Sequence, residues 1–132
     1  MNIIAGIISN IETDQNLSLV TIQTQGFSLT AVVIDTPKTA SYLNKEQPIN
    51  VLFKETEVIL AQDQSDIISL RNQIPGIITK IQSSQILSKV TLQTKVGAII
   101  SIITTKAVKA LKLEVGSKAT AMIKTNEVML SV

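Results

Sequence analysis

The sequence predicts a mainly β protein made of two tandem OB-like barrels, each with five strands and a short helix after the third strand. Three observations support this fold. The chain repeats itself at a spacing of 70 residues, each copy holds short β-branched segments that alternate apolar and polar residues, and turn residues separate those segments. A chain of 132 residues has room for one ordinary domain or two very small ones.

The duplication appears without gaps when residues 2–62 are placed on residues 72–132. Of these 61 pairs, 19 are identical, whereas chance would give only a few. The longest matches are Leu17–Thr24 with Leu87–Thr94, and Lys54–Leu60 with Lys124–Leu130. We therefore expect a first unit over residues 1–64 and a second over residues 69–132, joined by a short connector.

Each unit is expected to contain five strands, and its last two strands are expected to close its own barrel. The expected strands are Ile3–Ile11, Leu17–Thr24, Ser28–Ile34, Ile49–Phe53 and Val58–Leu60, followed by Ile74–Ile81, Leu87–Thr94, Ala98–Ile103, Ala119–Ile123 and Val128–Leu130. Turns are expected at Thr13–Asn16 and Ser83–Gln85, and then at Gly26 and Gly97.

A short helix is expected between the third and fourth strands of each unit. In the first unit Thr36 precedes Pro37, which favours the first position of a helix. In the second unit the segment from Thr105 to Leu111 has the same character, with threonine as the cap. Units of about 60 residues have thin cores, so we expect the barrels to pack on each other and on further chains.

The composition excludes several classes of function. There is no cysteine for a disulfide or a thiolate metal site, and no histidine for acid–base chemistry near neutral pH. No acids are evidently paired and no Ser or Thr stands beside an identifiable base, so we expect no enzyme. No apolar run reaches the roughly 18 residues of a membrane span, and no signal peptide is evident, which indicates a cytoplasmic protein.

The net charge of +2 hides a strong asymmetry. Residues 1–66 hold three lysines and eight acids, a net of −5, whereas residues 67–132 hold nine basic residues and two acids, a net of +7. Three interpretations stay open: drift on solvated surfaces, an anion site in the second half, and electrostatic pairing of unlike halves between subunits.

The second copy resembles the molybdenum-pterin-binding type of domain, called Mop or TOBE, and the whole chain resembles a di-domain molbindin. The resemblance lies in Ser69-x-Arg71-Asn72-Gln73, Gly76, Thr104-Thr105, Leu113-x-Val115-Gly116 and Ala119–Lys124 followed by Glu127-Val128-Met129. It implies binding and storage of molybdate or tungstate between subunits of a homotrimer, with a dimer or a hexamer as alternatives. It implies neither a nucleic acid nor a membrane as partner.

The resemblance also implies the residues of the oxyanion site. The matching positions are Ser69, Arg71, Thr104 and Lys124, with Asn72, Thr105 and Thr125 as neighbours of the pocket. Asn2 and Lys54 are the weaker candidates of the first copy, where Met1 stands for Arg71 and Ile34 stands for Thr104. A further family serine is replaced by Ala107, which removes one hydroxyl donor.

The chemistry of these residues suits a tetrahedral dianion, which exchanges its hydration shell for donors. Hydroxyls and backbone N–H groups at a helix start supply them, Arg71 adds a forked charged contact and Lys124 adds a point charge. Structural interpretations stay open beside this one. Arg71 suits a surface ion pair, Lys124 an edge-strand charge, Thr104-Thr105 a helix cap, and Asn72 with Asn2 a bond to backbone.

Two alternative functions remain at this point. The barrel pattern and the basic second half also suit an OB-type nucleic-acid-binding module, although Phe27, Tyr42 and Phe53 are the only aromatic residues for stacking. The degenerate first copy and Ala107 suit a regulatory or assembly module without a ligand.

Overall fold

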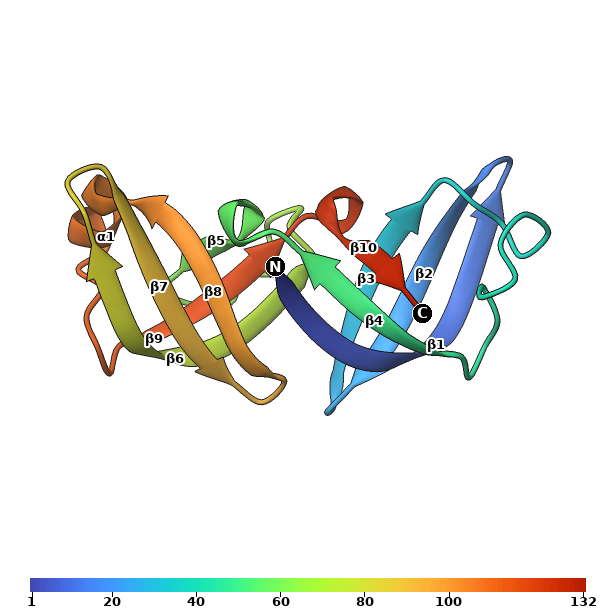
Figure 1. Cartoon of the computed structure of the whole chain (residues 1–132), viewed down its shortest axis with the longest axis horizontal. Helices are drawn as coiled ribbons and strands as arrows, with labels where there is room; N and C mark the ends of the chain where they lie inside the picture. The colour runs from blue at the N-terminus through green and yellow to red at the C-terminus, as the bar shows by residue number, and fades with distance from the viewer.

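The computed structural model describes residues 1–132 and contains ten strands in two antiparallel sheets of five. Figure 1 shows the two sheets as curled units side by side along the long axis of the molecule. The expected mainly β fold with two OB-like barrels is therefore confirmed. The first copy supplies β1 (Asn2–Asp14), β2 (Leu17–Thr24), β3 (Phe27–Val33), β4 (Pro48–Phe53) and β5 (Ile59–Ala61), and the second supplies β6 (Asn72–Ser83), β7 (Leu87–Thr94), β8 (Gly97–Thr104), β9 (Lys118–Ile123) and β10 (Met129–Ser131).

The fifth strand of each copy completes the sheet of the other copy. The strand orders are β10-β4-β1-β2-β3 and β5-β9-β6-β7-β8, with Leu130 opposite Val51 and Leu60 opposite Ala121. The expectation that each unit closes its own barrel was wrong. The 3₁₀ turns η1 (Glu55–Glu57) and η2 (Thr125–Glu127) lie between the fourth and fifth strands and lead the chain into the other unit (Figure 1).

The second unit alone contains the short helix that was expected in both. Helix α1 spans Thr105–Ala110, and neither it nor the 3₁₀ turns are long or apolar enough to cross a bilayer. In the first unit the matching residues form hydrogen-bonded turns. There the Thr39 hydroxyl accepts from the Thr36 amide at 2.8 Å, and such side-chain bonds compete with a helix. The residues of α1 are mostly lysine and alanine, which are better helix formers.

The long first strand of each copy bends because it carries an irregularity in register. The shift falls between Ile8 and Asn10 in β1 and between Ile78 and Lys80 in β6. Just before it, β6 passes so close to β7 that a Cβ on Gly76 would lie 2.7 Å from the carbonyl oxygen of Gln93. Glycine therefore lets one strand curl around the barrel and pair with neighbours on both sides.

The core follows the alternation of the strands, and its buried residues form one continuous cluster through both units. In β2 and β7 the inward residues Val20, Ile22, Val90 and Leu92 have no exposed surface. Val58, which precedes β5, lies beside the second unit, where its carbonyl accepts from the Ser101 hydroxyl at 2.8 Å. The two units are thus joined by packing as well as by the exchanged strands.

The connector between the copies covers the outer face of the second sheet. The Gln73 side chain bonds the backbone of Ser65 through both its oxygen and its nitrogen, and its nitrogen also donates to the Leu70 carbonyl. Met122, opposite Gln73 in the ladder, is only 2% exposed.

The matching outer face of the first sheet is not covered by the connector. There Ile3, Leu52 and Met129 form one cross-strand row, and Ile3 is 60% exposed. An apolar row of this kind is typical of a surface that contacts another chain.

Candidate anion-binding site

Arg71 and Lys124 are neighbours at one end of the second sheet. The last pair of the β6–β9 ladder joins Asn72 to Ile123, and Arg71 and Lys124 are the next residues outward on each strand. Thr125 follows Lys124 as the first residue of η2 and is half-buried. The antiparallel pairing therefore places the backbone of Arg71 beside that of Lys124, with Thr125 next along the chain.

Neither of these two cations has an acidic partner. The chain contains two ion pairs, both in the matching region of the first unit: the Met1 amino group lies 3.8 Å from Glu55, and Lys54 lies 3.9 Å from Glu57. In the second copy Thr125 replaces Glu55. The change removes a carboxylate and adds a hydroxyl donor, so the second unit keeps positive charge where the first is neutralised.

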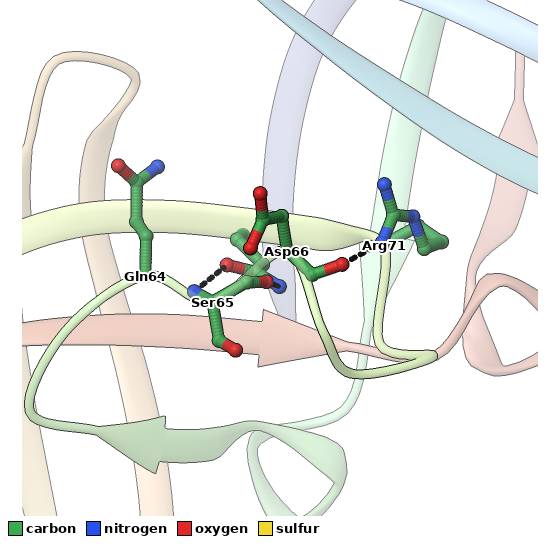
Figure 2. Close-up of a pocket in the computed structure, with 5 residues that line it drawn as sticks. Gln64, Ser65, Asp66 and Arg71 are labelled. Carbon is green, nitrogen blue, oxygen red and sulfur yellow. Dashed lines mark hydrogen bonds between the residues drawn. The ribbon is translucent and has the colours of Figure 1, made fainter.

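Arg71 also lies against the connector. Its Nη1 atom donates to the carbonyl oxygens of Ile68 at 3.2 Å and Asp66 at 3.4 Å, and Figure 2 shows the contact with Asp66. Arg71 and Asp66 line an open cavity of about 420 Å³ together with Gln64, Ser65 and Gln73. The remaining N–H groups of the guanidinium stay available for a ligand, since both bonds use one nitrogen. Ser69 lies exposed in the connector two residues before Arg71.

Thr104 and Thr105 have different roles at the start of α1. Thr104 is the N-cap, where its hydroxyl oxygen accepts from the Ala107 amide at 3.1 Å and keeps its own proton to donate. The Thr105 hydroxyl is buried, donates to the Ser84 carbonyl at 2.8 Å and lies 2.8 Å from the Ser88 hydroxyl. Thr105 thus holds the β6–β7 turn against α1, and its hydroxyl is fully used within the fold.

The structure does not bring Thr104 and Arg71 together within one chain. Thr104 lies opposite Leu87, beside the turn that ends β6, whereas Arg71 precedes the start of β6. The 12 residues of that strand lie between them, and at 3.3 Å per residue they make roughly 40 Å of strand. Figure 1 shows α1 at the outer end of the second unit and the start of β6 near the junction of the units.

Asn72 and Asn2 bind backbone of the opposite copy. The Asn72 side chain donates to the Thr30 carbonyl and accepts from the Thr30 amide, both at 2.8 Å. Asn2 makes the same two bonds to Ile100, also at 2.8 Å. Both carboxamides are buried and use these groups for structure, as the alternative interpretation of these residues had it. Asn72 therefore positions Arg71, its neighbour in the sequence.

Two carboxylates that the motifs did not single out meet between the units. Glu57 and Glu127 occupy matching places in η1 and η2. Hydrogen bonding with the Glu127 carboxyl, burial and the charge of Glu127 raise the pKa of Glu57, while Lys54 acts in the opposite direction. The sequence contains a signal for these residues, because both copies have glutamate at this position. The two carboxylates come close to each other only because the fifth strands are exchanged between the units.

The aromatic residues provide no stacking platform. Phe53 is buried in the core, and Phe27 and Tyr42 are half-buried. Proteins that bind single-stranded nucleic acids rely on exposed aromatic rings, so this surface does not support that alternative function.

The chain is similar to proteins that are named for molybdate binding or molybdenum transport. Residues 68–130 match the TOBE domain. The whole chain is similar to the solved structure of the cytoplasmic molybdate-binding protein ModG with molybdate bound. The TM-score is 0.89 and the identity 29%, over 99% of this chain and 95% of that one. MopII from Clostridium pasteurianum is 30% identical over 49% of this chain and 98% of its own, with a TM-score of 0.47.

A curated relative is the molybdenum transport protein ModE of Herbaspirillum seropedicae. It is 31% identical over 134 residues, which include 99% of this chain and 50% of that protein. The chain thus spans about half the length of the curated relative that it matches.

Proposed function

We propose that this chain, whose residues 68–130 match the TOBE domain and whose fold is similar to that of ModG over 99% of its length, is a di-domain molbindin that binds molybdate as a cytoplasmic storage or buffering protein. The binding residues are Arg71, Lys124, Ser69 and Thr125 at the junction and Thr104 at the outer end of the second unit. The role is binding and not catalysis, in keeping with relatives that are described as molybdate-binding or molybdenum transport proteins.

The observation that carries this proposal is the unpaired charge of Arg71 and Lys124. The same place in the first unit holds two carboxylates within 4 Å of its two cations. A dianion needs donors and positive charge that are not already satisfied, and the second unit alone retains them. Each charged hydrogen bond contributes roughly 1.5–3 kcal/mol, so three or four contacts suffice for micromolar binding.

The separation of Thr104 from Arg71 supports a site shared between subunits. One chain supplies the arginine and lysine, and the Thr104 hydroxyl comes from another chain. We propose that the assembly is a homotrimer. In a closed ring of three chains every chain contacts the next through the same interface, so every site between subunits is complete. The uncovered apolar row of Ile3, Leu52 and Met129 offers surface for such contacts.

Tungstate fits the same site on this proposal. It has the same charge and tetrahedral shape as molybdate, and hydrogen-bond donors with point charges respond to charge and shape. We therefore expect the two anions to compete for the same sites with similar affinity, and sulfate, which is smaller, to bind more weakly.

Calorimetry with molybdate tests the proposal. Arg71→Ala and Lys124→Ala should each weaken binding by about tenfold or more, because each removes a charged contact. Lys54→Ala is the matched control from the first unit and should leave the affinity unchanged. Native mass spectrometry of the same samples should show three chains, with molybdate lost in the two site variants. Absence of heat with molybdate, or equal affinity in all variants, would remove this function.

A further inference from the structure

We propose that the second unit carries another ligand site at the opposite end of β9, and that it takes a small organic phosphate, a doubly charged head group on an apolar body. The site is a cavity of about 370 Å³ lined by Lys95, Lys118 and Thr120 among ten residues. Nothing in the oxyanion site described above requires it, because Lys118 begins the six-residue strand β9 and Lys124 follows its other end.

Four separate segments form this cavity. Lys118 and Thr120 come from β9, Pro75 and Ile77 lie on the adjoining part of β6, and Lys95 begins the turn between β7 and β8. The connector closes the fourth side with Gln62–Gln64 directly after β5, whose last residue Ala61 lies opposite Thr120. The first unit also has an exchanged strand at this place, because Ser131 of β10 lies opposite Asn50, but the connector lies over the second unit.

The charge of the cavity favours an anion. Lys95 and Lys118 form no ion pair within the chain, and Asp63 is the one acid among the lining residues. At the matching positions of the first copy Gln25 replaces Lys95 and Pro48 replaces Lys118. These two lysines belong to the excess of positive charge in the second half, which the Arg71 site does not account for.

Thr120 adds a hydroxyl donor. The residue is 2% exposed and lines the cavity. A hydroxyl can donate one hydrogen bond, so this group can contact an anion in the cavity. A phosphate oxygen is a suitable acceptor, with the two ammonium groups to neutralise its charge.

The size and the apolar lining distinguish this ligand from a bare oxyanion. A volume of about 370 Å³ is at the lower end for small-molecule sites and exceeds by far the ~30 Å³ that one water occupies. Pro75 and Ile77 supply an apolar wall beside the lysines. A four-oxygen anion would leave that wall unused, whereas an organic phosphate contacts both parts.

Phenyl phosphate is the probe for the experiment, with inorganic phosphate as its comparison. In ¹H–¹⁵N spectra of the full chain, phenyl phosphate should shift the amides of Lys95, Lys118 and Thr120 and should bind several-fold more tightly than inorganic phosphate. Lys118→Gln and Lys95→Gln should each weaken it by roughly three- to tenfold, because rim charges are partly screened. Asp63→Asn should strengthen it by removing repulsion.

Matched variants separate this site from the molybdate site and from general charge effects. Lys80→Gln removes the same charge from β6 away from the cavity and should not change the binding of phenyl phosphate. Arg71→Ala should weaken molybdate binding by about tenfold or more, as proposed above, and leave the binding of phenyl phosphate intact. Equal affinity for the two phosphates, or weakening by Lys80→Gln as large as by Lys118→Gln, would overturn the site.

Discussion

The carboxamide of Asn72 holds both backbone groups of Thr30, 42 residues away in the other copy, through two hydrogen bonds of 2.8 Å. It thus acts as one more residue of a β-ladder along the outer edge of β3, which pairs with β2 on its other side. Asn2 does the same for Ile100, so the two units are joined by the same device on both sides of the junction.

Replacing Asn72 by alanine should destabilise the protein by about 2–4 kcal/mol. The change removes two hydrogen bonds and leaves the half-buried amide and carbonyl of Thr30 without these partners. Urea denaturation followed by circular dichroism measures the loss. Asn126→Ala, at an exposed position in η2, is the control and should change stability by less than about 0.5 kcal/mol.

Removing the last four residues, Met129 to Val132, should loosen the first unit although they belong to the second copy. They include the whole of β10 (Met129–Ser131), which pairs with β4 through Leu130 and Val51. Hydrogen exchange should show faster exchange at Val51 and Leu52 than in the full chain. A chain that lacks only Val132 is the control, and faster exchange confined to β9 would contradict the observed pairing.

Thr125→Glu should abolish molybdate binding without unfolding the protein. The change gives the second unit the carboxylate that Glu55 supplies in the first, and it would neutralise Lys124 or Arg71 and repel the anion. Calorimetry measures the affinity, and Thr125→Val separates loss of the hydroxyl from gain of charge by weakening binding only partly. Full binding by the glutamate variant would place the anion elsewhere.

Glu57→Gln should stabilise the protein increasingly as the pH rises. Because the pKa of Glu57 is raised above its ordinary 4.5 in the folded state, this group favours folding at low pH. That contribution falls as the pH rises from about 4.5 through the raised pKa. Glutamine keeps the hydrogen bond without the charge, so the difference in melting temperature between variant and wild type should grow over this range. A difference that stays constant over this range would contradict the raised pKa of Glu57.

The strand positions could be predicted from the sequence because burial alternates along each strand. Leu17–Thr24 and Leu87–Thr94 are strands with the expected bounds, and Gly26 and Gly97 adopt the positive φ angles of 84° and 105° at the expected turns. Pairing is less determined. The segment Val58–Leu60 is equally suited to either sheet. Its hydrophobic pattern indicates which face of the strand is buried but not which strand it pairs with.

The candidate site could be predicted only in part for a similar reason. The residue types that suit an oxyanion are evident in the motif of Ser69 and Arg71, but a motif does not show which groups the fold already uses. Thr105 and Asn72 have polar groups that suit an oxyanion, but both use these groups in hydrogen bonds within the fold. The contrast between Glu55 and Thr125 gains meaning only once the structure places them at matching ends of two ladders.

The exchange of β5 and β10 has a consequence for how the two copies diverged. Two separate single-copy chains with this pairing would form a symmetric dimer and would have to carry identical sites. The covalent connector turns that association into an intramolecular one and raises the effective concentration of each half for the other. The two copies in one chain can also differ in sequence. The first copy can therefore pair its cations with carboxylates, while the second keeps its cations unpaired and able to bind an anion.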